Sequence, residues 1–125
     1  MNNNTINFLI KLKNRSLQNS SSIILNTSSL TFSITKTLYK KGYIQGYTKV
    51  SKKQVKIFFR YFYNFSPLSY LKILSKSSIS IFVKFNQLSR IKVSKKLFFI
   101  ATLYGVLDNI DCKKKKIGGR LLFLC

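Results

Sequence analysis

The alternation of apolar and polar residues is clearest near the middle of the chain, from Val55 to Tyr61. Its apolar side carries Val55, Ile57, Phe59 and Tyr61, and the other side carries Lys56, Phe58 and Arg60. This period of two residues predicts a half-buried strand, whose aromatic residues we assign to a core first. The preceding apolar run, Ile44 to Val50, and a turn at Ser51 to Lys53 complete a predicted β-hairpin.

Two earlier segments have the spacing of amphipathic helices. The first runs from Thr5 to Leu12, and the second follows the candidate caps Thr27 and Ser28, places Leu30, Ile34 and Leu38 four apart, and ends at Gly42. Between them, Ser16 to Ser22 is expected to form a loop, and the apolar run Ile23 to Leu25 a short strand. Both helices are expected to lie against the core side of the hairpin.

The second half of the chain has shorter apolar runs. Strands are predicted at Leu71 to Leu74 and Ile79 to Val83, joined as a hairpin by Ser75 to Ser78, and again at Leu97 to Ile100 and Leu121 to Leu124. The segment from Asn86 to Lys96 is predicted to link these two strand pairs. A turn at Thr102 to Gly105, one helical turn at Val106 to Asp111, the charge run Lys113 to Lys116 and a break at Gly118 and Gly119 fill the last interval.

These elements predict an α/β fold of the α+β type in two small lobes. The single proline, in Asn64 to Pro67, marks the expected boundary. An N-terminal lobe of helix, strand, helix and hairpin is expected at residues 1–64. A C-terminal lobe, mostly β with a short helix, is expected at residues 65–125.

Charge then narrows the function. The 125 residues include 23 Lys and Arg against two acids, Asp108 and Asp111, which gives a formal net charge of +21. A surface of this size cannot neutralise that charge internally, so the expected partner is a polyanion such as nucleic acid. The cations are spread along the chain instead of lining one helix, and no apolar run approaches the roughly 18 to 20 residues of a membrane span. A membrane is therefore not an expected partner, although a cationic membrane-surface protein stays as an alternative.

Catalysis and metal binding lack the necessary residues. The chain has no His and no Glu, and its two carboxylates lie close together in one polar stretch, which leaves few groups for acid–base chemistry. Cys112 and Cys125 are too few for an ordinary metal site and have no His to activate them, so both are expected to be buried structural residues. We therefore expect no enzyme activity, no cofactor and no metal.

Several motifs carry a family resemblance. Ala101 to Leu107 reads ATLYGVL and is followed by Asp111-Cys112-Lys113 and then Gly118-Gly119-Arg120. These segments match S-T-S-x-G-[IV]-M, E-A-R and G-G-E at the same spacings. Near the start, Leu9 to Asn14 matches L-x-R-I-R-N, and Leu38 to Ile44 matches L-K-x-E-G-[FY]-I. On these motifs the chain resembles the eighth protein of the small ribosomal subunit (uS8 type), over nearly its whole length.

The resemblance implies an rRNA-binding protein and its contact residues. The S-T-S-x-G loop of that family packs against small-subunit rRNA, so the C-terminal candidates include Ala101, Thr102, Leu103, Tyr104 and Gly105. The further candidates are Lys113, Lys114, Lys116, Gly118, Gly119, Arg120, Ser75, Lys76, Lys11, Lys13 and Asn14. The loop departs from the family where Ala101 and Leu103 replace serines, so two hydroxyls that could bond to RNA are absent. The polar contacts implied by the resemblance would then come from the Thr102 hydroxyl and Tyr104. Arg120 replaces a glutamate.

By this resemblance the chain is expected to be a structural constituent of the ribosome. It would bind the central domain of small-subunit rRNA, support subunit assembly and touch the fifth and twelfth small-subunit proteins. A general basic nucleic-acid-binding protein outside the ribosome is the main alternative. The abundance of Lys, Asn, Ile, Phe and Tyr is typical of translation from an AT-rich genome. Met1 to Asn4 has no transit-peptide pattern, so we expect an organelle-encoded protein of the mitochondrial ribosome, with the plastid as the alternative.

Overall fold

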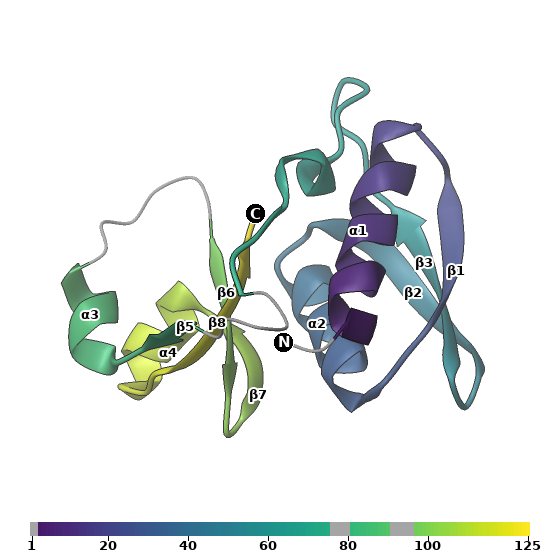
Figure 1. The fold of residues 1–125 in the computed structure, drawn as a ribbon. Helices are drawn as coiled ribbons and strands as arrows, with labels where there is room; N and C mark the ends of the chain where they lie inside the picture. The colour runs from purple at the N-terminus through teal and green to yellow at the C-terminus, as the bar shows by residue number, and fades with distance from the viewer. Residues whose placement is uncertain (1–2, 76–80, 91–96) are drawn as a thin grey trace. The chain divides into compact units, whose positions relative to one another are not determined.

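The computed structural model describes residues 3–75, 81–90 and 97–125. The chain divides into two compact units, Asn7–Leu71 and Lys72–Cys125, the second of which also includes Met1–Ile6. The expected boundary after residue 64 therefore falls inside the first unit. Figure 1 shows the elements of both units in one ribbon diagram. Each unit is described by itself below.

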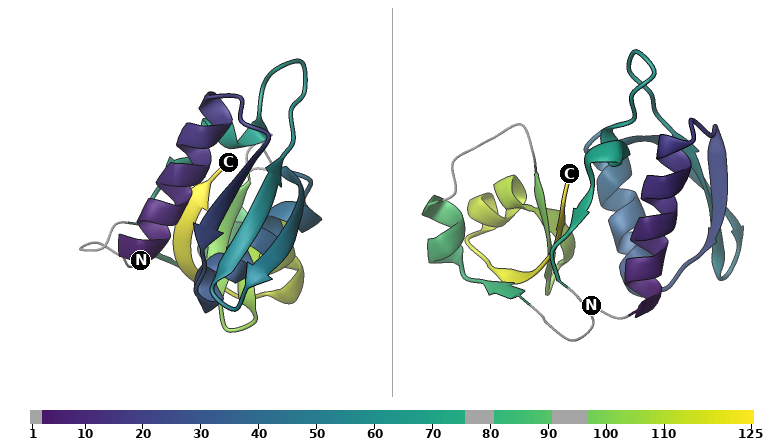
Figure 2. Two further views of the ribbon diagram at one scale, coloured as in Figure 1. Left: turned by 90° about the vertical axis from the view of Figure 1, so that its right-hand side faces the viewer. Right: turned by 45° about the horizontal axis from the view of Figure 1, so that its top comes forward.

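The N-terminal unit is a three-stranded antiparallel sheet with helices on one face. Its elements are α1 (Asn3–Leu17), β1 (Ser22–Asn26), α2 (Ser29–Lys40), β2 (Ile44–Ser51), β3 (Gln54–Phe59) and the 3₁₀ helix η1 (Pro67–Tyr70). The strand order is β1-β3-β2, so β3 is central. Figure 2 shows α1 and α2 on the same side of this sheet. The predicted hairpin and its coverage by two helices are thus confirmed.

The predicted period of two along β3 is also confirmed. Val55, Ile57 and Phe59 are buried, whereas Lys56 and Phe58 on the other face are only half-buried. The Lys56 ammonium lies 5.3 Å from the centroid of the Phe58 ring. Phe58 therefore belongs to the outer face of the sheet and not to the core.

The ends of the two helices follow from local hydrogen bonding. The Ser28 hydroxyl accepts a bond from the Thr31 N–H while the Thr31 hydroxyl accepts one from the Ser28 N–H, which is a reciprocal capping box at the start of α2. This confirms Ser28 as the cap. The first helix extends to Leu17, so the predicted loop begins later than Ser16, whose buried hydroxyl donates to the Lys13 carbonyl.

The C-terminal unit is a second antiparallel sheet with two short helices. Its elements are β4 (Lys72–Ile73), β5 (Ile81–Val83), α3 (Phe85–Arg90), β6 (Phe98–Thr102), β7 (Gly105–Asp108), α4 (Asn109–Lys115) and β8 (Gly119–Leu124). The strand order is β4-β8-β6-β7, and β5 also pairs with β8. The α+β class predicted from the sequence is confirmed.

The predicted hairpin of the segments around β4 and β5 is wrong. Lys72 and Ile73 pair with Leu124 and Phe123, and Ile81 to Val83 pair with Leu121 to Gly119. Both short strands therefore lie along the same edge of β8, one after the other, and among the described residues they do not pair with each other. The apolar pattern identified the strands but not their partner, because that pattern indicates which face of a strand is buried and not which strand pairs with it.

Two further assignments in this unit need correction. Val106 to Asp108 is strand, not helix, because β7 pairs with β6 from Gly105 to Asp108. The helix starts only at Asn109, where the Asp108 side chain caps it by accepting from the Asp111 N–H. The segment from Asn86 to Arg90, predicted as linker, lies in the short helix α3.

The core of the C-terminal unit lies under β6 and β8. Ile100 and Cys112 form a buried cluster against which Val83, Leu107 and Leu121 pack. Phe99 and Phe123, opposite each other on β6 and β8, are stacked with their ring centroids 4.7 Å apart. This packing joins α4, through Cys112, to the sheet that carries the β6–β7 hairpin.

Candidate nucleic-acid interface

The predicted RNA-facing loop is the tip of the β6–β7 hairpin. Thr102 and Gly105 form the last pair of the ladder, so Leu103 and Tyr104 alone make the turn. Gly105 has φ of +97°, a conformation that costs other residues energy, which explains the glycine at this position. Ala101 and Thr102 are strand residues. Of the five predicted loop residues, only Leu103 and Tyr104 project fully from the sheet.

The Thr102 hydroxyl is occupied within the turn. It donates to the Gly105 carbonyl at 2.8 Å and accepts from the Tyr104 N–H at 3.1 Å. A hydroxyl has one proton and two lone pairs, so Thr102 has no proton left for a phosphate and one lone pair left for an incoming donor. A hydrogen bond donated by Thr102 to a phosphate is therefore incompatible with this turn, whereas acceptance from a ribose 2′-hydroxyl is compatible with it.

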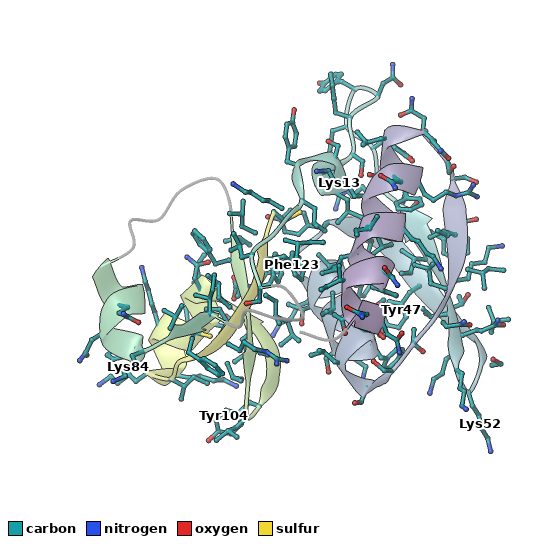
Figure 3. All side chains as sticks on the ribbon, viewed as in Figure 1. Lys13, Tyr47, Lys52, Lys84, Tyr104 and Phe123 are labelled. Carbon is teal, nitrogen blue, oxygen red and sulfur yellow. The ribbon has the colours of Figure 1, made fainter. Side chains whose placement is uncertain are left out.

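Tyr104 is the aromatic side chain at the tip. It is 69% exposed, and Figure 3 shows it at the far end of the hairpin. The Lys115 ammonium lies 5.2 Å from its ring centroid, so an α4 cation covers part of the ring. The ring therefore does not pack into the core, and its free surface can stack on a base.

The glycine pair is explained by contacts inside the protein. A Cβ on Gly118 would lie 2.3 Å from the Val83 carbonyl oxygen, and one on Gly119 would lie 2.2 Å from the Ala101 carbonyl oxygen. Real Cβ atoms do not approach oxygen so closely, so β8 can start between β5 and β6 only with glycines there. The candidates Gly118 and Gly119 thus act by letting three strands meet.

A groove of about 320 Å³ lies beside the hairpin tip. It is lined by Phe82, Ala101, Thr102, Leu103, Gly118, Gly119 and Arg120. Arg120 faces Phe82 on one side and Ala101 on the other in the strand register. Its Nε is buried and has no hydrogen-bond partner in the part of the chain that the structure describes. The positive charge of Arg120 in the lining favours an anionic ligand at this groove.

The lysine run continues the same surface along α4. Lys113, Lys114 and Lys115 form the last turn of the helix, where cations also suit its dipole. Lys116 caps the helix with φ of +56°, and its N–H donates to the Lys113 carbonyl. Lys114, Lys115 and Lys116 are exposed, and Lys113 is half-buried. The run predicted as a charge cluster is therefore an exposed helix end.

The cysteines have no reactive character. Both are buried and free, as predicted. Burial raises the pKa of the Cys112 thiol to about 11, with a smaller contribution from Asp108 and Asp111, and burial raises the pKa of the Cys125 thiol to about 12. Both thiols stay protonated near neutral pH. No group of three metal-ligating side chains occurs within residues 3–75, 81–90 and 97–125.

The remaining candidates fall into three different settings. Lys11 and Asn14 are exposed on α1 and Lys13 is half-buried there, all in the N-terminal unit. The Ser75 side chain is buried, donates to the Leu121 carbonyl and accepts from the Ile81 N–H, so its hydroxyl holds β5 to β8. Lys76 lies outside the described residues.

Two residues near the hairpin tip were not among the candidates predicted from the sequence. Phe82 lines the groove and is strongly exposed, and Lys115 covers the Tyr104 ring. Successive side chains of a strand point to opposite faces, so Phe82 lies on the face opposite to Ile81 and Val83. This signal could have identified Phe82 as a surface residue. Its position next to Arg120 depends on the pairing of β5 with β8, which the sequence did not reveal.

Comparison with known proteins gives one consistent result. A family model described as "Ribosomal protein S8" matches residues 3–125. Three similar curated proteins are each named "Small ribosomal subunit protein uS8". The one from Malacoplasma penetrans is 26% identical over 118 residues, covering 91% of this chain and 90% of its own. The Ehrlichia canis protein is 27% identical over 120 residues (93% and 91%), and the Borreliella burgdorferi protein is 28% identical over 118 residues (91% and 89%).

These matches include both structural units. No described helix is both long enough and apolar enough to cross a membrane. The identity of 26–28% is low, but the similarity extends over about nine tenths of this chain and of each relative.

Proposed function

The chain belongs to the ribosomal protein S8 family, and from this membership we infer that it is a structural constituent of the small ribosomal subunit that binds small-subunit rRNA. The physical properties agree with this function. A net charge of +21 on 125 residues needs a polyanionic partner, and the family is a structural one with no catalytic role to propose.

We propose that the β6–β7 tip, the groove beside it and the end of α4 form the main rRNA-binding surface. The observation that carries this proposal is the exposed Tyr104 ring at the hairpin tip, next in the chain to Leu103, which lines a groove together with the cationic Arg120. A ring supplies stacking and a guanidinium supplies a phosphate contact. Leu103 adds an apolar surface, and Lys113, Lys114 and Lys116 supply charge.

Other predicted site residues support this surface indirectly. Ala101 and Thr102 shape the last rungs of the hairpin, Gly105 permits its turn, and Gly118 and Gly119 let β8 approach its neighbours. Ser75 ties two strands together. In the N-terminal unit, Lys11, Lys13 and Asn14 remain proposed as contacts to the RNA backbone, since they lie on α1 and match the family's opening motif. Lys76 is proposed as a further phosphate contact.

We further propose the place of this protein within the cell. Its RNA target is the central domain of small-subunit rRNA, and its protein neighbours are the fifth and twelfth small-subunit proteins, as the family resemblance implies. The residue bias of an AT-rich genome supports a mitochondrial ribosome, with the plastid as the alternative. Ribosomes from purified mitochondria and from purified plastids are separated on gradients, and the small-subunit fractions are analysed by mass spectrometry. The organelle whose small subunits contain this protein is its location.

The RNA proposal is tested by crosslinking the full chain to RNA and sequencing the bound fragments. Sequences from one helical region of small-subunit rRNA support it, whereas an even distribution over unrelated RNAs identifies a general nucleic-acid-binding protein. Lys114→Ala and Lys52→Ala make a matched pair, because Lys52 is also exposed but lies at the tip of the β2–β3 hairpin in the other unit. Only Lys114→Ala is expected to reduce crosslinks to the fragment.

A further inference from the structure

A second group of exposed aromatic residues lies in the N-terminal unit, after β3. Tyr63 is 97% exposed, Phe65 65% and Tyr70 61%, and Phe62 is also exposed. Figure 1 shows the segment between β3 and η1 as a teal loop projecting from the sheet. Side chains of this size are normally placed in cores, so four of them together at the surface indicate a binding site.

The turn that carries these residues is closed and strained. The Phe62 N–H donates to the Phe65 carbonyl at 2.7 Å, and the Phe65 N–H donates to the Phe62 carbonyl at 2.9 Å. Tyr63 and Asn64 therefore make a two-residue turn, with φ of +50° and +67°. Positive φ is common for Asn but unfavourable for Tyr, and the exposed Tyr63 ring gains no packing in return. Strain of this kind is kept where a side chain is needed for function.

A groove of about 390 Å³ adjoins this turn. Phe65 and Tyr70 supply aromatic surface to its lining, Leu17 supplies aliphatic surface, and Asn19, Asn64 and Ser69 supply amide and hydroxyl groups. Its volume is within the range of roughly 300–1,000 Å³ in which proteins hold small ligands. Aromatic rings beside side-chain amides are the groups that stack on a nucleobase and bond its edges.

The charge around this region favours RNA over protein as the partner. Every charged residue from Asn7 to Leu71 is Lys or Arg. The Arg60 guanidinium lies 4.6 Å from the Phe62 ring centroid and is itself exposed, so one cation is held beside the aromatic turn. Rings interleaved with cations on an acid-free surface are typical of platforms for unpaired nucleic acid, in which bases stack and phosphates are neutralised.

We propose that Phe62–Phe65, Tyr70 and the adjoining groove bind unpaired RNA bases, as a second RNA contact separate from the β6–β7 tip. This inference rests on the proposed rRNA-binding function and adds the class of RNA element that the N-terminal unit recognises. The bases stack on the exposed rings, the amides of Asn19 and Asn64 bond base edges in the groove, and Arg60 contacts a phosphate.

Tryptophan fluorescence tests stacking at this turn directly. The chain has no tryptophan, so Tyr63→Trp creates a single reporter at the turn, and Val50→Trp creates a control on an exposed residue near Lys52 and Lys53. A single-stranded RNA of about 12 nucleotides is expected to quench the Tyr63→Trp signal strongly, and a duplex of equal length only weakly. Equal quenching of the two reporters, or equal quenching by the two RNAs, overturns the proposal.

A second pair of variants separates binding from folding. Tyr63→Gly relieves the positive φ, so it is expected to raise the urea midpoint of unfolding while weakening binding of the single strand about tenfold. Tyr63→Phe keeps the ring and is expected to bind normally. Loss of stability in Tyr63→Gly with unchanged RNA affinity means that the turn is only structural, and overturns the proposal.

Failure of this inference can be told apart from failure of the proposed function. If the full chain binds small-subunit rRNA and the Tyr63→Gly and Phe65→Ala variants bind it equally well, the inference fails while the function stands. If those variants keep their RNA affinity but no longer enter the small subunit, the turn contacts a protein, and the inference also fails. If the unaltered chain prefers no part of small-subunit rRNA over unrelated RNA, the proposed function fails.

Discussion

The Thr102 hydroxyl donates a hydrogen bond to the backbone carbonyl of Gly105, 2.8 Å away on the opposite strand, and so closes the β6–β7 hairpin from within. The same oxygen accepts from the Tyr104 N–H at 3.1 Å. One side chain thereby holds the aromatic residue at the tip and the glycine that permits the turn. Its contribution to RNA binding is thus expected to be indirect, through the position of Tyr104.

Replacing Thr102 tests this indirect role. Thr102→Val keeps the β-branched shape but removes both bonds, so we expect the free energy of unfolding to fall by about 1 kcal/mol. Affinity for the rRNA fragment is expected to fall by about threefold to tenfold, because the tip is no longer preorganised. Thr102→Ser, which keeps the hydroxyl, is the control. If Thr102→Val loses binding at full stability, the hydroxyl contacts RNA itself.

Tyr104 is expected to act through its ring. Tyr104→Ala removes a stacking surface worth roughly 1 to 3 kcal/mol, so specific rRNA binding should weaken by about tenfold to a hundredfold. The exposed ring has little share in the core, so thermal stability should change little. Filter binding to the cognate fragment and to a scrambled duplex is the measurement. Tyr104→Phe should bind nearly normally unless the phenol hydroxyl also contacts RNA.

Gly118, just before β8, and Gly119, its first residue, should tolerate substitution far less than a glycine with room around it. Gly119→Ala places a Cβ 2.2 Å from the Ala101 carbonyl oxygen and is expected to destabilise the C-terminal unit by about 3 kcal/mol. Gly46→Ala, on β2, meets nothing within 4 Å and should be neutral or slightly stabilising. Urea unfolding of both variants decides the matter, and similar midpoints would contradict the proposed close approach.

RNA affinity should fall steeply with salt, because exposed lysines displace condensed counterions from the RNA. If about six to ten phosphates are engaged, affinity should drop by roughly three to five decades between 50 and 200 mM salt. Lys114→Ala should weaken binding to all RNAs similarly and lower the salt slope by about one. Titrations at several salt concentrations measure the slope, and a flat dependence would contradict phosphate-centred binding.

Because both thiols are buried, we expect the folded chain to lose stability at alkaline pH. Their pKa values in the folded chain, about 11 for Cys112 and about 12 for Cys125, lie above the ordinary value of 9.0. A raised pKa means that the folded state holds the proton more tightly, so this stability is complete below pH 9 and is lost as pH rises toward 11 and 12. Cys125→Ala should flatten the pH dependence of unfolding above pH 9. An unchanged profile would show that the thiol does not contribute.

The N-terminal unit could be predicted from sequence because its signals are local. Ser28 lies where a capping box requires a hydroxyl, and Val55, Ile57 and Phe59 alternate over enough residues to fix both strand and face. Phe58 was the exception. An aromatic residue is expected in a core, but the period of two places Phe58 on the outer face of the sheet. In each confirmed case a short stretch of chain contained all the information that its structure needed.

The C-terminal unit was less predictable because its strands are short. Val106 to Asp108 is too brief to show a period, and an aspartate at its end is typical of a turn or a cap. Its strand structure comes from β6, just as that of β4 and β5 comes from β8. The proposed site followed the same rule: the family motif pointed to Ala101 and Thr102, but only the pairing of strands showed that Phe82 and Arg120 lie beside them.

The position of β8 constrains the order in which the two sheets can fold during synthesis. β4, β5 and β6 all pair with β8, and among the described strands β4 and β5 have no other partner. During synthesis, the C-terminal sheet therefore stays incomplete until Gly119–Leu124 has emerged from the ribosome. The β1-β3-β2 sheet has all its strands by Phe59 and can form earlier. A nascent chain stalled before Gly119 would expose a folded N-terminal sheet followed by a basic segment in which β4 and β5 lack their partner strand.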